Sequence, residues 1–322
     1  MSNLAIAAVS VLLATNQPSA VSNLVHSHTG VPVPVAATND PVERELEKLM
    51  LADDEARAEI QKWVRDNDAF AEKGAGLPVS EMRQRVRERF KLIRKGYEDL
   101  ISLHTNRADI RVAYASYLGD LGEEDSAIDQ LEVARLIDTN NPAIWNNLAN
   151  LYGHNGEVKK SFVYYAKAIE LEPTEPVYYH NFGTTVFLFR KDAKEHYSIN
   201  EQQVFDKALA LYSNAIRLDP KDFKLAADVA QTFYGIQPPR TDDALRAWTN
   251  AFQLASDDVE REGVQIHFAR VKWKAGRFDE ARGHLGMVTN AQNLEVKRRV
   301  LKSLEAELEK RASTNAAAVE VR

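Results

Sequence analysis

The side chains that could do chemistry in this 322-residue chain are amides and scattered imidazoles, and none of them follows a catalytic pattern. The chain has no cysteine and no His-Glu-x-x-His, Gly-x-Ser-x-Gly, phosphate-loop or dinucleotide-binding pattern. Its eight histidines stand at positions 26, 28, 104, 154, 180, 196, 267 and 284. We therefore predict no catalytic residue, no metal site and no cofactor, and we expect that the protein is not an enzyme.

Asparagine is the residue type whose placement suggests an activity. Asn146, Asn147 and Asn150 share one segment, and Asn181 follows Asn147 after 34 residues. A side-chain amide both donates and accepts hydrogen bonds, so it can pair with the N–H and C=O of another polypeptide. A nucleic-acid partner is not expected, because the net charge of −6 offers no basic domain to neutralise phosphates.

The elements that must position these amides repeat along the chain. Residues 141–152 align with residues 175–186, again at an interval of 34. Small residues recur where two helices must pack closely: Ala115, Ala149, Gly183, Ala230 and Ala269, and then Ala127, Ser161, Ala208, Ala244 and Ala281. Each member of the second set is followed four residues later by a bulky one: Leu131, Tyr165, Tyr212, Trp248 and Leu285.

In this period and these positions the chain resembles the tetratricopeptide repeat (TPR) family. The resemblance implies an all-α fold, a right-handed superhelical array of helix-turn-helix repeats. Five repeats are expected, at residues 108–141, 142–175, 176–222, 223–258 and 259–290. The second matches the family best and the fifth is degenerate. Residues 191–204 lengthen the turn of the third, either as an accessory contact or as a neutral insertion.

Helices are also expected on both sides of the array. Asp40-Pro41 is typical of a helix start, and residues 40–107 are predicted to form an N-terminal helical hairpin and cap. Its first helix is acidic and its second basic, which indicates pairing between them, although a basic helix could instead meet an anionic partner. A capping helix is predicted at 291–312 and a disordered tail at 313–322.

The first 39 residues differ in composition from the rest. The apolar run from Leu4 to Ala14 is too short to span a bilayer, so no integral membrane span is expected. Its length suits a signal peptide at residues 1–20, followed by a flexible Pro/Val linker at 21–39, although a positively charged start is missing. The protein is then exported, to a periplasmic or extracellular place; the alternative is a cytoplasmic protein with a frayed N-terminal helix.

The family resemblance also implies where a partner would bind. In TPR proteins the first helices line a concave groove that holds a peptide or a partner helix, so we expect a non-catalytic protein-interaction scaffold. The implied groove residues are Asn146, Asn150 and His154, then His180, Asn181 and Thr184, then Lys224 and Gln231. The asparagines could instead be a common feature of such repeats. The alternative function is a self-assembling structural or complex-assembly protein that uses the repeat ends or the hairpin.

One subclass of the family grips a C-terminal carboxylate with two asparagines and several cations. Asn150, Asn181 and Lys224 match that pattern, but Asn146 and Asp228 stand where cations are expected. Fewer cations and an added anion weaken carboxylate capture. We therefore do not expect an adaptor for chaperone tails.

Overall fold

A computed structural model describes residues 40–72 and 74–320 of the chain. Every element in this part of the chain is helical, which confirms the predicted all-α class. The predicted signal peptide (1–20), the linker (21–39) and the last two residues of the predicted tail lie outside the described residues. The chain divides into two compact units, unit 1 (Met1–Pro173) and unit 2 (Thr174–Arg322), and each is described by itself.

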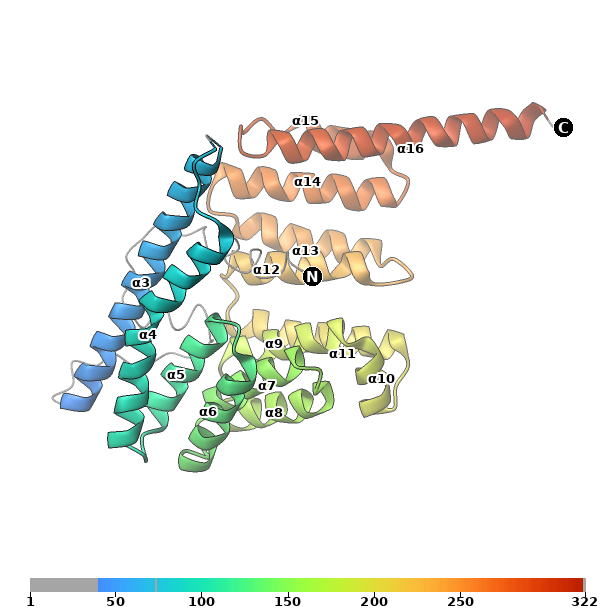
Figure 1. The fold of residues 1–322 in the computed structure, drawn as a ribbon. Coiled ribbons are helices and arrows are strands. Elements are labelled where there is room, and N and C mark those ends of the chain that lie inside the picture. Colours follow the sequence, from blue (N-terminus) through green and yellow to red (C-terminus); the bar gives the residue numbers. More distant parts are fainter. Residues whose placement is uncertain (1–39, 73, 321–322) are drawn as a thin grey trace. The chain divides into compact units, whose positions relative to one another are not determined.

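Unit 1 opens with a helical hairpin, α3 (Pro41–Ala71) and α4 (Val79–Leu103), whose helices lie side by side (Figure 1). The side chain of Asp40 accepts a hydrogen bond from the Val42 N–H at 2.9 Å and caps α3. Tyr97 of α4 is buried and its ring stacks on Tyr114 of the first repeat, with 5.3 Å between ring centroids. The hairpin therefore shares one hydrophobic core with the repeats that follow it.

Charge pairing in the hairpin differs from the expected match of an acidic helix with a basic one. Between α3 and α4, Arg89 Nε pairs with Glu59 Oε2 at 2.7 Å. Other hairpin cations reach the first repeat instead: Arg57 pairs with Asp120 at 3.1 Å, and Arg94 pairs with Glu123. The basic residues thus help to fix the hairpin to the array.

Two helix pairs complete unit 1. They are α5 (Ala108–Asp120) with α6 (Glu124–Ile137) and α7 (Pro142–His154) with α8 (Val158–Leu171). Gly122 and Gly156 turn the chain within each pair at φ 76° and 85°, a left-handed conformation that glycine adopts without strain. Ala149 and Ser161 are fully buried where α7 meets α8, and the Ser161 hydroxyl donates to the Ala149 carbonyl at 2.7 Å.

Unit 2 is also built from helix pairs and contains one extra helix. Its elements are α9 (Pro176–Leu188), α10 (Arg190–Tyr197), α11 (Glu201–Leu218), α12 (Phe223–Thr232), the 3-10 turn η1 (Phe233–Gly235), α13 (Thr241–Leu254), α14 (Asp258–Lys274), α15 (Phe278–Gly286) and α16 (Leu294–Glu320). Gly183 of α9 shows why a small residue recurs there. A Cβ atom on it would lie 2.9 Å from the Tyr212 ring of α11.

The sequence predicts that residues 191–204 only lengthen a turn. In the structure, the first half of this insertion belongs to a helix, α10. Ser198 ends this helix at φ 54°, and Asn200 and Gln203 form a capping box that starts α11. Gln202 then donates to the backbone carbonyl of Gln237 at 2.6 Å. The end of the insertion therefore rests on the turn of the fourth repeat.

The last helix, α16, packs Val300 and Leu304 against the buried Ala269, Ala281 and Leu285 of the fifth repeat. It continues to Glu320, although the residue pattern predicts a helix that ends at residue 312 and a disordered tail at 313–322. The added segment contains three consecutive alanines, at positions 316–318. Alanine has the highest intrinsic helix propensity, which favours continuation of the helix.

Candidate functional site

Three of the eight predicted groove residues belong to unit 1, where packing within the unit already occupies two of them. Asn146 is fully buried, and its amide donates to Asn147 Oδ1 at 3.3 Å. Asn150 accepts a hydrogen bond from the hydroxyl of Tyr165, a bulky core residue of α8. His154 is exposed, at the end of α7. The family resemblance predicts that Asn146 faces a partner in the groove. In the structure its side chain lies inside the protein and cannot contact a partner there.

Three predicted residues lie on α9 of unit 2. Thr184 accepts a hydrogen bond from the Tyr212 hydroxyl at 3.1 Å, and Asn181 is half-buried. The Nε2 atom of His180 lies 3.9 Å from a carboxylate oxygen of Asp228 on α12. Burial lowers the pKa of His180 and raises the pKa of Asp228, and for both groups burial outweighs the attraction between them. At neutral pH the imidazole is therefore uncharged and the contact is not a full ion pair.

The remaining two predicted residues, Lys224 and Gln231, lie on α12 and are exposed. Neither side chain makes a hydrogen bond or an ion pair with any residue that the structure describes. They stand seven residues apart, which is about two helical turns and about 10 Å along one side of the helix. Their donor groups are available to an external ligand.

Next to these two residues the structure brings together a group that sequence reasoning did not assemble. Tyr234, 40% exposed, follows α12, and its hydroxyl oxygen lies 3.0 Å from Nδ1 of His267 on α14. The His267 ring stacks on Trp248 of α13, with centroids 3.9 Å apart and planes 10° apart. The sequence predicts Trp248 as a bulky packing residue, but it assigns no role to His267. No repeat spacing signals this pair, because Tyr234 follows the small residue Ala230 by four residues whereas His267 precedes the matching Ala269 by two.

The His267 imidazole is neutral and Arg270 supplies the positive charge of this group. Burial, with a smaller contribution from the Arg270 guanidinium, lowers the pKa of His267 to about 4, so its imidazole is neutral at physiological pH. Arg270 follows His267 by three residues on α14, which places both on one side of the helix. Within the described part of the chain, Arg270 forms no ion pair. We call Lys224, Gln231, Tyr234, His267 and Arg270 the α12–α14 face.

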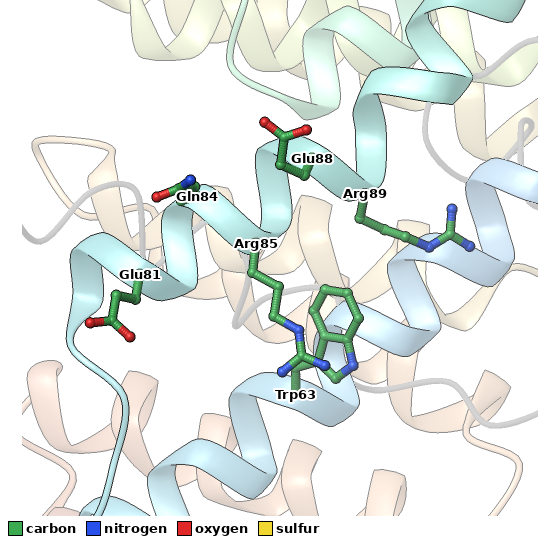
Figure 2. Close-up of a pocket in the computed structure, with 6 residues that line it drawn as sticks. All are labelled: Trp63, Glu81, Gln84, Arg85, Glu88 and Arg89. Atoms are coloured by element: carbon green, nitrogen blue, oxygen red, sulfur yellow. The ribbon is translucent and has the colours of Figure 1, made fainter.

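Unit 1 contains a surface hollow between the two helices of the hairpin, shown in Figure 2. Its lining residues are Trp63, Glu81, Gln84, Arg85, Glu88 and Arg89. The guanidinium of Arg85 lies 3.9 Å from the centroid of the Trp63 ring and covers that aromatic face. The hollow therefore presents a ring that a cation of the same chain already occupies.

No group of three or more histidine, aspartate or glutamate side chains in residues 40–72 and 74–320 is arranged to hold a metal ion. None of the helices in those ranges combines the length and the apolar character that crossing a membrane requires.

Comparisons with known proteins support the resemblance drawn from residue spacing. The family model for the tetratricopeptide repeat matches residues 142–175. Two relatives are photosystem I assembly proteins Ycf3 of Prochlorococcus marinus, 29% identical in subsp. pastoris (strain CCMP1986 / NIES-2087 / MED4) and 28% identical in strain MIT 9301. Each alignment covers 116 residues, 36% of this chain and 61% of the relative, so the chain spans about three-fifths of the length of these relatives.

Solved structures of helical repeat proteins are also similar. PilF of Pseudomonas aeruginosa has a TM-score of 0.49 at 14% identity, over 79% of this chain and 99% of PilF. YrrB, described as a TPR protein with an unusual peptide-binding site, has a TM-score of 0.46 at 13% identity, over 66% of this chain and 97% of YrrB.

Proposed function

We propose that this chain, which is a tetratricopeptide-repeat protein and a protein-interaction scaffold, holds a segment of a partner polypeptide on the α12–α14 face of unit 2. The observation that carries the proposal is the set of unused polar groups on that face. Lys224 and Gln231 are exposed donors without a partner among the described residues. Tyr234, His267 and Arg270 extend the same surface from α12 to α14.

The spacing of these donors fits an extended polypeptide. The distance of about 10 Å between Lys224 and Gln231 corresponds to roughly three residues of extended chain, at about 3.3–3.6 Å per residue. Lys224 can donate to a carbonyl oxygen or a carboxylate, and the Gln231 amide can both donate to and accept from a backbone. Such contacts provide affinity that depends only weakly on the partner's side chains.

The experiment is affinity capture from the native host with the immobilised protein, followed by mass spectrometry. The test variant is Lys224→Ala with Gln231→Ala. The matched control is Lys302→Ala with Gln292→Ala, which removes the same residue types from exposed positions. We expect the wild type and the control to retain a common partner, and the test variant to retain at least about tenfold less. Equal retention by all three proteins, with unchanged circular dichroism, would contradict the proposal.

A second function, assembly of a multi-protein complex, is favoured by the two relatives that are named as photosystem I assembly proteins. The partner would then be a subunit that the chain holds before it joins its complex. Captured partners that also copurify with one another in the absence of this chain would support this role. Self-assembly makes a different prediction, because light scattering would then report a mass that rises above 36.2 kDa with concentration.

Export is a separate proposal, carried by the apolar run at residues 4–14. Mass spectrometry of the protein from its native host tests it directly. A mature N-terminus near residue 21 is expected if the first 20 residues are a signal peptide. An N-terminus at residue 1 or 2 would contradict export by that route and would favour the cytoplasmic alternative.

A further inference from the structure

The position of the His267 ring is fixed on two sides. Trp248, which is 1% exposed, supports its face at 3.9 Å between centroids. The Tyr234 hydroxyl holds its edge, 3.0 Å from Nδ1, and lies 3.4 Å from the backbone carbonyl oxygen of His267 itself. An imidazole held on its face and on one edge keeps a constant direction for its other nitrogen, Nε2.

The contact with Tyr234 admits the tautomer in which the imidazole carries its hydrogen on Nε2. Burial raises the pKa of Tyr234, so the phenol keeps its proton and can donate it to Nδ1, the nearer of its two acceptors. A neutral imidazole has one N–H group, and when Nδ1 accepts, that group is on Nε2. Nε2 makes no hydrogen bond with the described residues and is available as a donor.

Charge at this place is positive and uncompensated. Arg270 is the charged residue whose field acts on both His267 and Tyr234, and no carboxylate among the described residues forms an ion pair with it. The Arg270 side chain is half-buried, so its charge is less screened than that of a fully exposed arginine. A guanidinium of this kind gains most from an anion that accepts hydrogen bonds.

We infer that Tyr234, His267 and Arg270 form a subsite for a carboxylate of the bound segment. The inference rests on the proposed function of the α12–α14 face. One carboxylate oxygen accepts from the Arg270 guanidinium and the other from His267 Nε2–H, while Tyr234 acts as a positioning residue that holds the edge of the ring. The carboxylate comes from an aspartate or glutamate side chain or from the partner's C-terminus. The subsite lies in the fourth and fifth repeats and does not use the asparagine positions of the carboxylate-binding subclass.

The probe is an array of random twelve-residue peptides, prepared in one set with free C-terminal carboxylates and in another with C-terminal amides. The full-length protein is tested as wild type, as Arg270→Gln and as Arg282→Gln, the last a control at an exposed position of α15. We expect bound peptides to need an acidic residue or a free C-terminus, and the two sets tell these sources apart. Arg270→Gln should weaken their binding at least about tenfold, and Arg282→Gln should not.

A double-mutant cycle separates direct contact from a general effect on structure. For a peptide that binds through one acidic residue, changing that residue to its amide and changing Arg270 to Gln should each weaken binding, with little further loss when both are changed. His267→Phe keeps a ring on Trp248 but lacks Nε2–H, and it should show the same coupling. Affinity should not fall between pH 8 and pH 5.5, because a bound carboxylate raises the pKa of His267 and protonation of the ring strengthens the contact.

The outcomes distinguish the inference from the function on which it rests. If peptides bind and need Lys224 and Gln231 but show no preference for a carboxylate, the subsite is absent while the α12–α14 face still holds a polypeptide. Additive losses in the double-mutant cycle would also overturn the subsite. If no peptide binds the wild type and the host capture fails as well, the proposed function itself is wrong.

Discussion

The second repeat and the pair formed by the fourth and fifth repeats use their polar residues in opposite ways. In the second repeat, which the family model matches, Asn146 is buried and Asn150 accepts from a core tyrosine. In the later pair, Lys224 and Gln231 are exposed without such partners, and Arg270 has no ion pair among the described residues. The repeat that conforms best to its family devotes these polar groups to its own packing.

This difference indicates where a repeat protein can acquire specificity. A repeat whose amides are needed between its helices cannot change them for a new partner without losing stability. The fourth and fifth repeats keep the small residues Ala230, Ala244 and Ala269 in their cores, all at most 5% exposed, so their surfaces are free to vary. Variants of the later pair and of the second repeat therefore test this contrast.

Trp248→Ala should destabilise the later pair most. The indole is 1% exposed and supports His267, so its removal should leave a cavity and lower the free energy of unfolding by about 3–5 kcal/mol. Urea unfolding followed by circular dichroism measures the change. Leu188→Ala is the control, since that side chain is 62% exposed and should cost less than about 0.5 kcal/mol. A similarly small loss of stability for Trp248→Ala would show that the fourth and fifth repeats have no well-packed core beneath the α12–α14 face.

Acidification should weaken the fold partly through His267. Its pKa is about 4 in the folded protein against an ordinary 6.5, so the unfolded chain takes up a proton first as the pH falls. Stability is therefore complete above pH 6.5 and decreases down to about pH 4, by about 3 kcal/mol for this residue. Arg270 and Tyr234 are the charged and titratable groups that act on it.

Unfolding free energies at pH 7 and pH 4.5 measure this effect. His267→Phe should lose clearly less stability between these pH values than the wild type. Burial also lowers the pKa of His180 and His284, which remain in the variant and account for part of the residual loss. An identical pH dependence in the two proteins would mean that His267 is as accessible to protons as a surface histidine.

The smallest effect concerns the amides themselves. Asn150→Ala removes the acceptor for the Tyr165 hydroxyl and should cost about 1 kcal/mol of stability. Gln231→Ala removes an exposed side chain without a described partner and should change stability by less than about 0.5 kcal/mol. Thermal or urea unfolding of both variants provides the comparison. Equal costs would remove the contrast between a repeat that uses its amides internally and one that displays them.

The fold could be predicted from sequence because its determinants are local and periodic. Close helix packing requires small residues at fixed intervals, and residues such as Ala149 and Ser161 are indeed fully buried. A turn that needs a left-handed residue selects glycine, as at Gly156. Each of these constraints acts at one position and leaves a mark in the sequence.

The site was harder to predict because it depends on side-chain directions. Helical spacing places Asn146 and Asn150 near one another but does not reveal that one is buried and that the other meets Tyr165 across the helix pair. The group around His267 comes from three helical elements, and periodicity does not specify that its ring lies parallel to Trp248. The helix α10 was also missed, since its eight residues contain few apolar positions to mark it.

The packing of α16 has a consequence for how such a chain can change its length during evolution. Val300 and Leu304 pack on the fifth repeat as Val264 and Val271 of α14 pack on the fourth, so α16 occupies the place that a first helix takes after a preceding repeat. A gene duplication that adds one more repeat before residue 291 would present α16 with the same small and bulky residues. The terminal helix would then close a longer array without any compensating substitution.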